Sequence, residues 1–168
     1  VAGEQLVKDY YRQYGLPYVI VRPSAVYGPL DIGDRVIAKF LIAAMRGRTL
    51  TVNGADEKLD FTYVDDAAAG IIAATLSKHT GTYNITKGHS CTLEEAANLS
   101  VKLAGNGTVA VKEKDSSFPS RGALNIDAVK ADFGYDPKVN IEEGFQKYHE
   151  WLTNSVYWSP KAVSQSSE

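Results

Sequence analysis

The stretch that most constrains the fold covers residues 19–29 and reads VIVRPSAVYGP. It begins with an apolar run rich in β-branched residues, which favours a buried strand. It ends in a loop marked by Pro23, Gly28 and Pro29, where neither a helix nor a central strand continues readily. In an open α/β sheet, ligands bind at the loops that follow the carboxyl ends of parallel strands. We therefore predict that this loop borders a ligand site.

Helix and strand patterns alternate on either side of this stretch. Apolar residues at helical spacing predict a helix over residues 2–14, and the strand of the opening stretch then covers residues 18–22. Further helices are expected after Asp34, after Asp65 or Asp66, after Thr92 (a capping box with Glu95), over residues 127–132 and after Asn140 (with Glu143), and further strands over residues 49–53, 59–64, 82–86 and 108–112. This alternation predicts an α/β fold with a parallel sheet.

Composition excludes several classes of protein. The 168 residues suffice for a compact domain, and a net charge of -2 without a basic run speaks against a nucleic-acid surface. The single cysteine, Cys91, excludes an internal disulfide and a cysteine zinc cluster and favours a reducing, cytoplasmic location. No apolar stretch reaches membrane-spanning length. The chain starts at Val1 in a helical pattern without a cap, which favours a fragment over the mature end of a cut precursor.

Individual polar residues give weak signals of chemistry. Glycine-rich nucleotide loops and the common hydrolase motifs are absent from the sequence, and we expect no metal site. We expect the adjacent Asp65 and Asp66 to cap a helix rather than act as an acid–base pair, and Cys91 to be a small core residue. Arg121 and Arg35 are each either a phosphate clamp or a plain surface arginine. Solvated or core-edge roles are expected for the three histidines, His79, His89 and His149.

Five segments, taken in order, resemble the C-terminal half of an extended short-chain dehydrogenase/reductase of the nucleotide-sugar epimerase/dehydratase family. They are residues 3–6 (GEQL), 22–29 (RPSAVYGP), 59–66 (LDFTYVDD), 81–85 (GTYNI) and 134–137 (GYDP). The resemblance implies the C-terminal part of a Rossmann-type parallel sheet, with its last helix and strands in residues 1–29 and 66–87. It also implies a small α/β substrate-binding domain in residues 30–65 and 88–154, followed by a flexible tail over residues 155–168.

The resemblance also implies an activity for the full protein. It would be an NAD(P)-dependent epimerase or dehydratase that transiently oxidises a sugar hydroxyl, with NAD or NADP as cofactor, a nucleotide sugar as substrate and a homodimeric assembly. The family's catalytic Tyr-x-x-x-Lys is expected just upstream of Val1, so this chain would carry no catalytic residue and would be inactive alone. A reductase acting on a smaller hydroxy or keto compound, or a non-catalytic binding domain, remain alternatives.

Site residues follow from the same resemblance. The cofactor would be lined by Pro23, Ser24, Ala25 and Val26. The residues implied to bind the substrate are Ala25, Arg35, Val36, Thr51, Asn53, Phe61 and Arg121. The chain departs from the family at Ala25, where an asparagine is frequent, and at Leu59, where an arginine commonly contacts the pyrophosphate. Lys58 or Arg121 would have to compensate for that missing arginine.

Overall fold

The computed structural model describes residues 2–31, 35–114 and 121–155 of the chain. In chain order the elements are α1 (Ala2–Tyr14), β1 (Val19–Pro23), β2 (Val26–Tyr27), α2 (Val36–Met45), β3 (Thr49–Asn53), β4 (Lys58–Leu59), β5 (Thr62–Tyr63), α3 (Val64–Leu76), β6 (Gly81–Ile85), β7 (Cys91–Thr92), α4 (Leu93–Ala104), β8 (Thr108–Lys112), α5 (Asp127–Phe133) and α6 (Ile141–Asn154). Some features of the sequence lie outside the described residues: the expected helix cap Asp34, most of the loop before Arg121, and nearly all of the tail.

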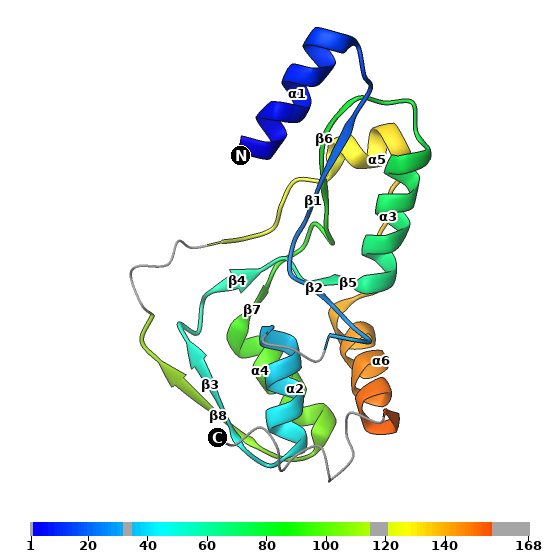
Figure 1. Cartoon of the computed structure of the whole chain (residues 1–168). Helices are drawn as coiled ribbons and strands as arrows, with labels where there is room; N and C mark the ends of the chain where they lie inside the picture. Colours follow the sequence, from blue (N-terminus) through cyan, green and yellow to red (C-terminus); the bar gives the residue numbers. More distant parts are fainter. Residues whose placement is uncertain (1, 32–34, 115–120, 156–168) are drawn as a thin grey trace, which may run out of the picture.

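The described strands form four pairs. β1 pairs with β6, β2 with β5 and β3 with β8, all in parallel, whereas β4 and β7 are antiparallel. Figure 1 shows the β1–β6 pair with α3 and α5 at one end of the molecule, and the β3–β8 pair with α2 and α4 at the other. The short β2–β5 and β4–β7 pairs lie between them. The predicted α/β class with parallel strand pairing is confirmed.

Buried side chains divide into two hydrophobic clusters. The larger cluster joins α2, β3, α4 and α6 and contains Leu41, Leu50, Phe145 and Tyr148. The smaller cluster lies on β6 and α5 and consists of Tyr83, Ile85, Ile126, Val129 and Tyr135. The segment that carries α5, which the resemblance assigns to the substrate-binding domain, therefore packs on the β1–β6 pair. The predicted domain boundaries themselves stay a prediction.

Two helix starts follow the predicted caps. At α4 the Thr92 hydroxyl accepts the backbone N–H of Glu95 at 3.0 Å, and the Glu95 carboxylate accepts that of Thr92 at 2.8 Å. This is the reciprocal pattern of a capping box. At α6 the Asn140 side chain accepts the backbone N–H of Glu143 at 2.8 Å. Both predicted starts are confirmed.

Two other helix starts differ from the prediction. The N-cap of α2 is Arg35, one residue after the expected Asp34, and its side chain makes no cap hydrogen bond. The N-cap of α3 is Tyr63, so Asp65 and Asp66 lie in the first turn and do not cap it. The capping prediction for these two aspartates was wrong because Asp66 turns inward to bind a distant segment, as described below.

The extended segment predicted over residues 59–64 is divided in the structure. Asp60 and Phe61 separate β4 from β5, and both side chains are buried. β4 then pairs with β7 and β5 with β2, so the two halves of the segment join different neighbours.

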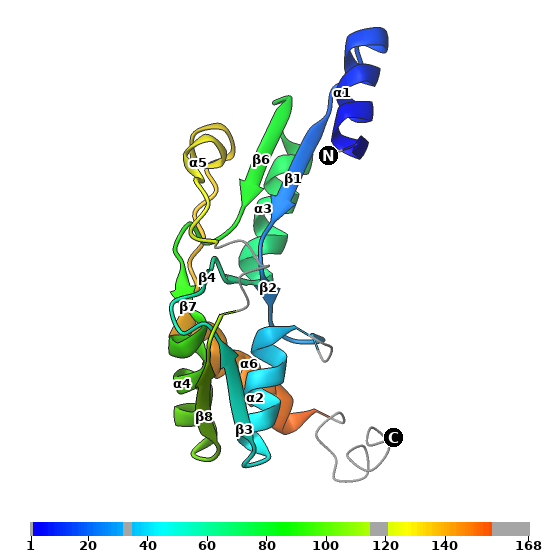
Figure 2. The same ribbon diagram turned by 90° about the vertical axis from the view of Figure 1, so that its left-hand side faces the viewer.

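Helix α1 stands beside β1 and apart from both clusters (Figure 2). No residue between Ala2 and Tyr14 is buried. Arg22 donates to Glu4 with Nε 2.7 Å from Oε1, and the rings of Tyr11 and Tyr18 meet edge to face at 5.6 Å between centroids. Among the helices of the described residues, none has the length and apolar character needed to cross a bilayer.

Candidate functional site

The loop that follows β1 borders a groove of about 380 Å³. Its lining comes from the end of β2, the start of α3 and the loop before α2, and consists of Val26, Tyr27, Gly28, Pro29, Leu30, Asp31, Arg35 and Val64. The groove lies beyond the carboxyl end of β1, which is the edge where open α/β sheets bind ligands. Two of the predicted site residues, Val26 and Arg35, meet here.

Ala25 precedes this groove in an unusual backbone conformation. Its φ is 39°, in the left-handed region that residues with a Cβ rarely adopt. Such a conformation costs about 1–2 kcal/mol and persists where the surroundings enforce it, often at functional sites. Here the Ala25 carbonyl accepts the backbone N–H of Thr62 at 3.3 Å, which ties the loop to β5. The strain gives the loop between β1 and β2 a fixed shape.

Two contacts made by its guanidinium group hold Arg35 over the groove. Its Nη1 donates to the Val26 carbonyl at 3.0 Å, and its Nε lies 4.0 Å from Asp31 Oδ1. The side chain is 65% exposed, so part of the guanidinium stays open to an anionic group. The neighbouring Val36 is half-buried and packs against the larger cluster instead. The structure thus brings Arg35 to the groove and Val36 to the core beneath it.

Tyr27 forms the buried floor of the groove. Its ring packs edge to face on Phe61, Tyr63 and Phe145, with centroids 5.5–6.3 Å apart. Burial in this aromatic group raises the pKa of the Tyr27 phenol far above its ordinary value, so the hydroxyl stays protonated. Phe61 is buried behind Tyr27 and supports the floor from within.

Pro23 and Ser24 lie at the end of β1 and in the loop before Ala25, and the other predicted site residues, Thr51, Asn53 and Arg121, are exposed; none of the five lines this groove. Thr51 and Asn53 are on the exposed face of β3, and Arg121 begins the coil that leads to α5. Lys58 lines a different groove beside Cys91 and Glu95.

A buried carboxylate that the sequence analysis did not single out lies between the two clusters. Asp60 is 1% exposed and accepts the Thr86 hydroxyl at 2.9 Å, the backbone N–H of Gly88 at 3.1 Å and that of Leu124 at 3.0 Å. The sequence signal is one acidic residue between Leu59 and Phe61 in an otherwise apolar strand. A charge in that position is buried only when several donors satisfy it.

Comparison with known proteins shows to which family the chain belongs. The model of the NAD dependent epimerase/dehydratase family matches residues 1–86, which is half of the chain. The chain belongs to the NAD-dependent epimerase/dehydratase family. The matched region contains the groove, Ala25, Arg35 and Asp60.

Individual epimerase/dehydratase relatives agree with this assignment. UDP-glucuronic acid decarboxylase 3 of Arabidopsis thaliana is 34% identical over 147 residues, which are 84% of this chain and 43% of the relative. An epimerase from Methanothermobacter thermautotrophicus has a TM-score of 0.88 at 25% identity and covers 96% of this chain. The UDP-glucose 4-epimerase of Thermus thermophilus, solved with NAD, has a TM-score of 0.83 at 27% identity. The chain spans 50% and 52% of these two solved chains, about half of each.

Two further polar residues, Asp66 and Cys91, make hydrogen bonds that give them structural roles. Asp66 accepts the backbone N–H groups of Lys138 and Val139, each at 2.9 Å, and so fastens the segment before α6 to α3. Cys91 donates its thiol to the Thr92 carbonyl at 3.3 Å, and burial raises its pKa to about 12. A thiol with so high a pKa is not a nucleophile at neutral pH. The Cys91 observation supports the structural interpretation from the sequence, whereas Asp66 has a structural role other than the predicted helix cap.

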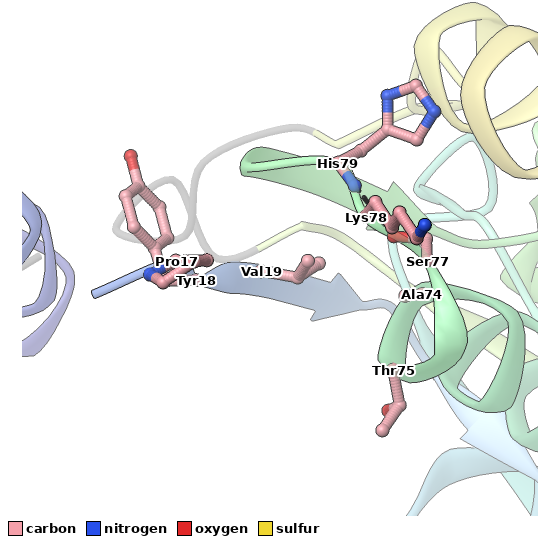
Figure 3. A pocket seen from close by; sticks show the side chains of 8 residues that line it. All are labelled: Pro17, Tyr18, Val19, Ala74, Thr75, Ser77, Lys78 and His79. Atoms are coloured by element: carbon pink, nitrogen blue, oxygen red, sulfur yellow. Dashed lines mark hydrogen bonds between the residues drawn. The ribbon is translucent and has the colours of Figure 1, made fainter. Parts of the chain in front are cut away.

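A second groove, of about 560 Å³, lies at the opposite end of β1 (Figure 3). It runs between the start of β1 and the end of α3, and Tyr18, Lys78 and His79 are among its lining residues. His79 Nδ1 is 3.7 Å from Asp132 Oδ2, which gives this histidine a partner at the core edge. Ligands of open parallel sheets bind at the other end of the strands, so for an epimerase/dehydratase the groove beside Arg35 is the candidate site.

Proposed function

We propose that this chain is the substrate-binding half of an NAD(P)-dependent nucleotide-sugar epimerase or dehydratase. The observation that carries the proposal is the loop after β1, which holds Ala25 in a left-handed conformation and places Arg35 over a groove at the carboxyl end of the strand. Relatives that match the chain include a UDP-glucuronate 4-epimerase and a dTDP-glucose 4,6-dehydratase by name. Decarboxylases of UDP-glucuronic acid also match, so the reaction proposed is one that begins with oxidation of a sugar hydroxyl.

The residues proposed to line the cofactor suit a flat ring. Ser24, Ala25 and Val26 are small or apolar and only partly buried, and Pro23 has no backbone N–H to satisfy. When bound, NAD supplies hydride acceptance and return. The chain's own part is to keep the loop rigid, through the Thr62 hydrogen bond to Ala25, and to exclude water from that side.

The charged and polar residues would orient the substrate. Arg35 and Arg121 are cations suited to the nucleotide and its diphosphate, and Thr51 and Asn53 present polar groups along the exposed face of β3 for the base. The proton of the sugar hydroxyl would pass to the tyrosine of the Tyr-x-x-x-Lys expected upstream of Val1. A homodimer would use the exposed face of α1.

A thermal-shift panel on the full protein tests this proposal. UDP-, dTDP-, GDP- and CDP-sugars are each added in the presence of NAD, and at least one is expected to raise the melting temperature. Arg121→Ala should reduce that shift, because losing a charge-assisted phosphate contact costs about 1.5–3 kcal/mol. Arg48→Ala is the matched control, since Arg48 is also exposed and lies outside the proposed site. Product analysis then separates epimerase, dehydratase and decarboxylase activity.

A reductase of a smaller hydroxy or keto compound is the second candidate. It is favoured by Leu59, which packs on the larger cluster where a pyrophosphate-binding arginine is common in the family. No thermal shift with any nucleotide sugar, together with NADH or NADPH oxidation in the presence of a small keto compound, would support it. Absence of any hydride transfer by the full protein would support a non-catalytic binding domain.

A further inference from the structure

The Asp60 carboxylate joins three parts of the chain that are distant in sequence. Its partners are 26, 28 and 64 residues away, at Thr86, Gly88 and Leu124. Thr62 adds a parallel link, because its hydroxyl accepts the backbone N–H of Lys87 at 3.1 Å. These buried hydrogen bonds fasten the end of β6 and the coil before α5 to the segment between β4 and β5.

The coil fastened by Asp60 is the one that carries Arg121. Leu124, whose N–H reaches Asp60, is three residues after Arg121, and the next carbonyl, of Asn125, accepts the Asn84 side chain at 2.9 Å. The side chain of Ile126 packs closely against Gly88: a Cβ added at this glycine would lie only 2.6 Å from the Ile126 Cδ1. The coil is therefore held from Leu124 onward, and the Asp60 bond is the first of these contacts after Arg121.

We propose that Asp60 is a positioning residue for diphosphate binding: it fixes the coil so that Arg121 meets the diphosphate of the substrate. The inference rests on the proposed function, which gives Arg121 that contact. A flexible arginine loses conformational freedom when it binds an anion, and a coil fixed three residues away lowers that cost. Asp60 itself is too deeply buried to touch the ligand.

A double-mutant cycle with UDP as the probe tests the inference in the full protein. Calorimetric titration gives the UDP dissociation constant for the unsubstituted protein, Asp60→Ala, Arg121→Ala and the double variant. Asp60→Ala is expected to weaken UDP binding about tenfold with Arg121 present and less than about twofold in the Arg121→Ala background. Asp60→Asn keeps an acceptor for Leu124 and Thr86, so it should restore most of the affinity and also serves if the alanine variant does not fold.

Asp66→Ala is the matched control. Asp66 is also buried and also holds backbone N–H groups, but those of Lys138 and Val139, so its removal should destabilise the protein without coupling to Arg121. An equal Asp60→Ala effect with and without Arg121 would overturn the inference alone. If UDP does not bind, the cycle is run with whichever of dTDP, GDP and CDP binds. Failure of the unsubstituted protein to bind any of the four would overturn the proposed function, and the inference with it.

Discussion

Ala25 keeps its backbone at a φ of 39° although it has a Cβ. The Thr62 hydrogen bond and partial packing on the larger cluster hold it there. The sequence marks this position only through a family resemblance, because alanine has no local preference for the left-handed region. The strain arises from the path of the loop between β1 and β2, and that path is set by the strands with which β1 and β2 pair.

Ala25→Asn is expected to stabilise the fold. Asparagine adopts the left-handed region more readily than alanine, so the free energy of unfolding should rise by about 0.5–1 kcal/mol. Urea unfolding followed by circular dichroism measures it. Ala25→Val is the opposing control, because a β-branched side chain is least tolerated at positive φ, and it should lower stability. Equal stability of the two variants would contradict the strain.

Among the elements, those with local signals were predicted best. The capping residues of α4 and α6 lie three positions from their partners, so the sequence pattern alone contains the whole interaction. The contacts of Asp60 and Asp66 reach across 26 to 73 residues, and no local pattern records them. That is why the division of β4 from β5 and the inward turn of Asp66 were missed. The site residues on the loop after β1 could be named from resemblance, but their hydrogen bonds could not.

The capping box of α4 makes stability depend on pH. Hydrogen bonds from Thr92, above all from its backbone N–H, hold the pKa of Glu95 below its ordinary value of 4.5. The resulting stabilisation is complete above that ordinary value and is lost as the pH falls through the lower folded pKa. Thr92→Ala should cost about 1 kcal/mol at neutral pH. The stability difference between Glu95 and Glu95→Gln proteins should shrink on acidification below pH 4.5. Urea titrations across this range measure both, and a difference constant with pH would refute the assignment.

Helix α6 supports the groove floor through a glycine. A Cβ at Gly144 would overlap the Tyr27 hydroxyl and lie 2.9 Å from its Cζ, so Gly144→Ala should displace Tyr27. We expect a loss of about 1–3 kcal/mol despite the better helix propensity of alanine. Adding Tyr27→Phe removes the overlapping hydroxyl and should recover part of that loss. Gly3→Ala in α1, where nothing lies within 4 Å of the new Cβ, is the control, and it should leave stability unchanged or raise it slightly through helix propensity. Thermal unfolding of the four proteins gives the comparison.

At the scale of the whole molecule, two separate apolar surfaces face solvent. Leu6, Tyr10 and Tyr14 are more than half exposed on α1, and so are Ile72 and Leu76 on α3. In the described residues β1 also pairs on one side only. The chain corresponds to about half of the solved relatives, and half of a Rossmann-type fold lacks the neighbours of its edge strand.

The 168-residue chain alone is therefore expected to self-associate. Exposed apolar faces and an open strand edge both favour pairing with another chain. Light scattering after size-exclusion chromatography should show species larger than a monomer, and their fraction should rise with concentration. Leu6→Glu combined with Tyr14→Glu should reduce it, whereas charge added at the exposed Thr153 of α6 should not. A monomer at all concentrations would show that these faces do not drive assembly.

The buried hydrogen bonds of Asp60 and Thr62 also set a rule for protein engineering. They connect residues 60–62, at the junction of β4 and β5, to residues 86–88, which directly follow β6, and the two short segments meet between the two hydrophobic clusters. A chimera that exchanges one cluster for that of a relative would separate these partners if a crossover fell between them. Recombination of specificity within this fold must therefore transfer both segments as one unit, even though they are not contiguous in the gene.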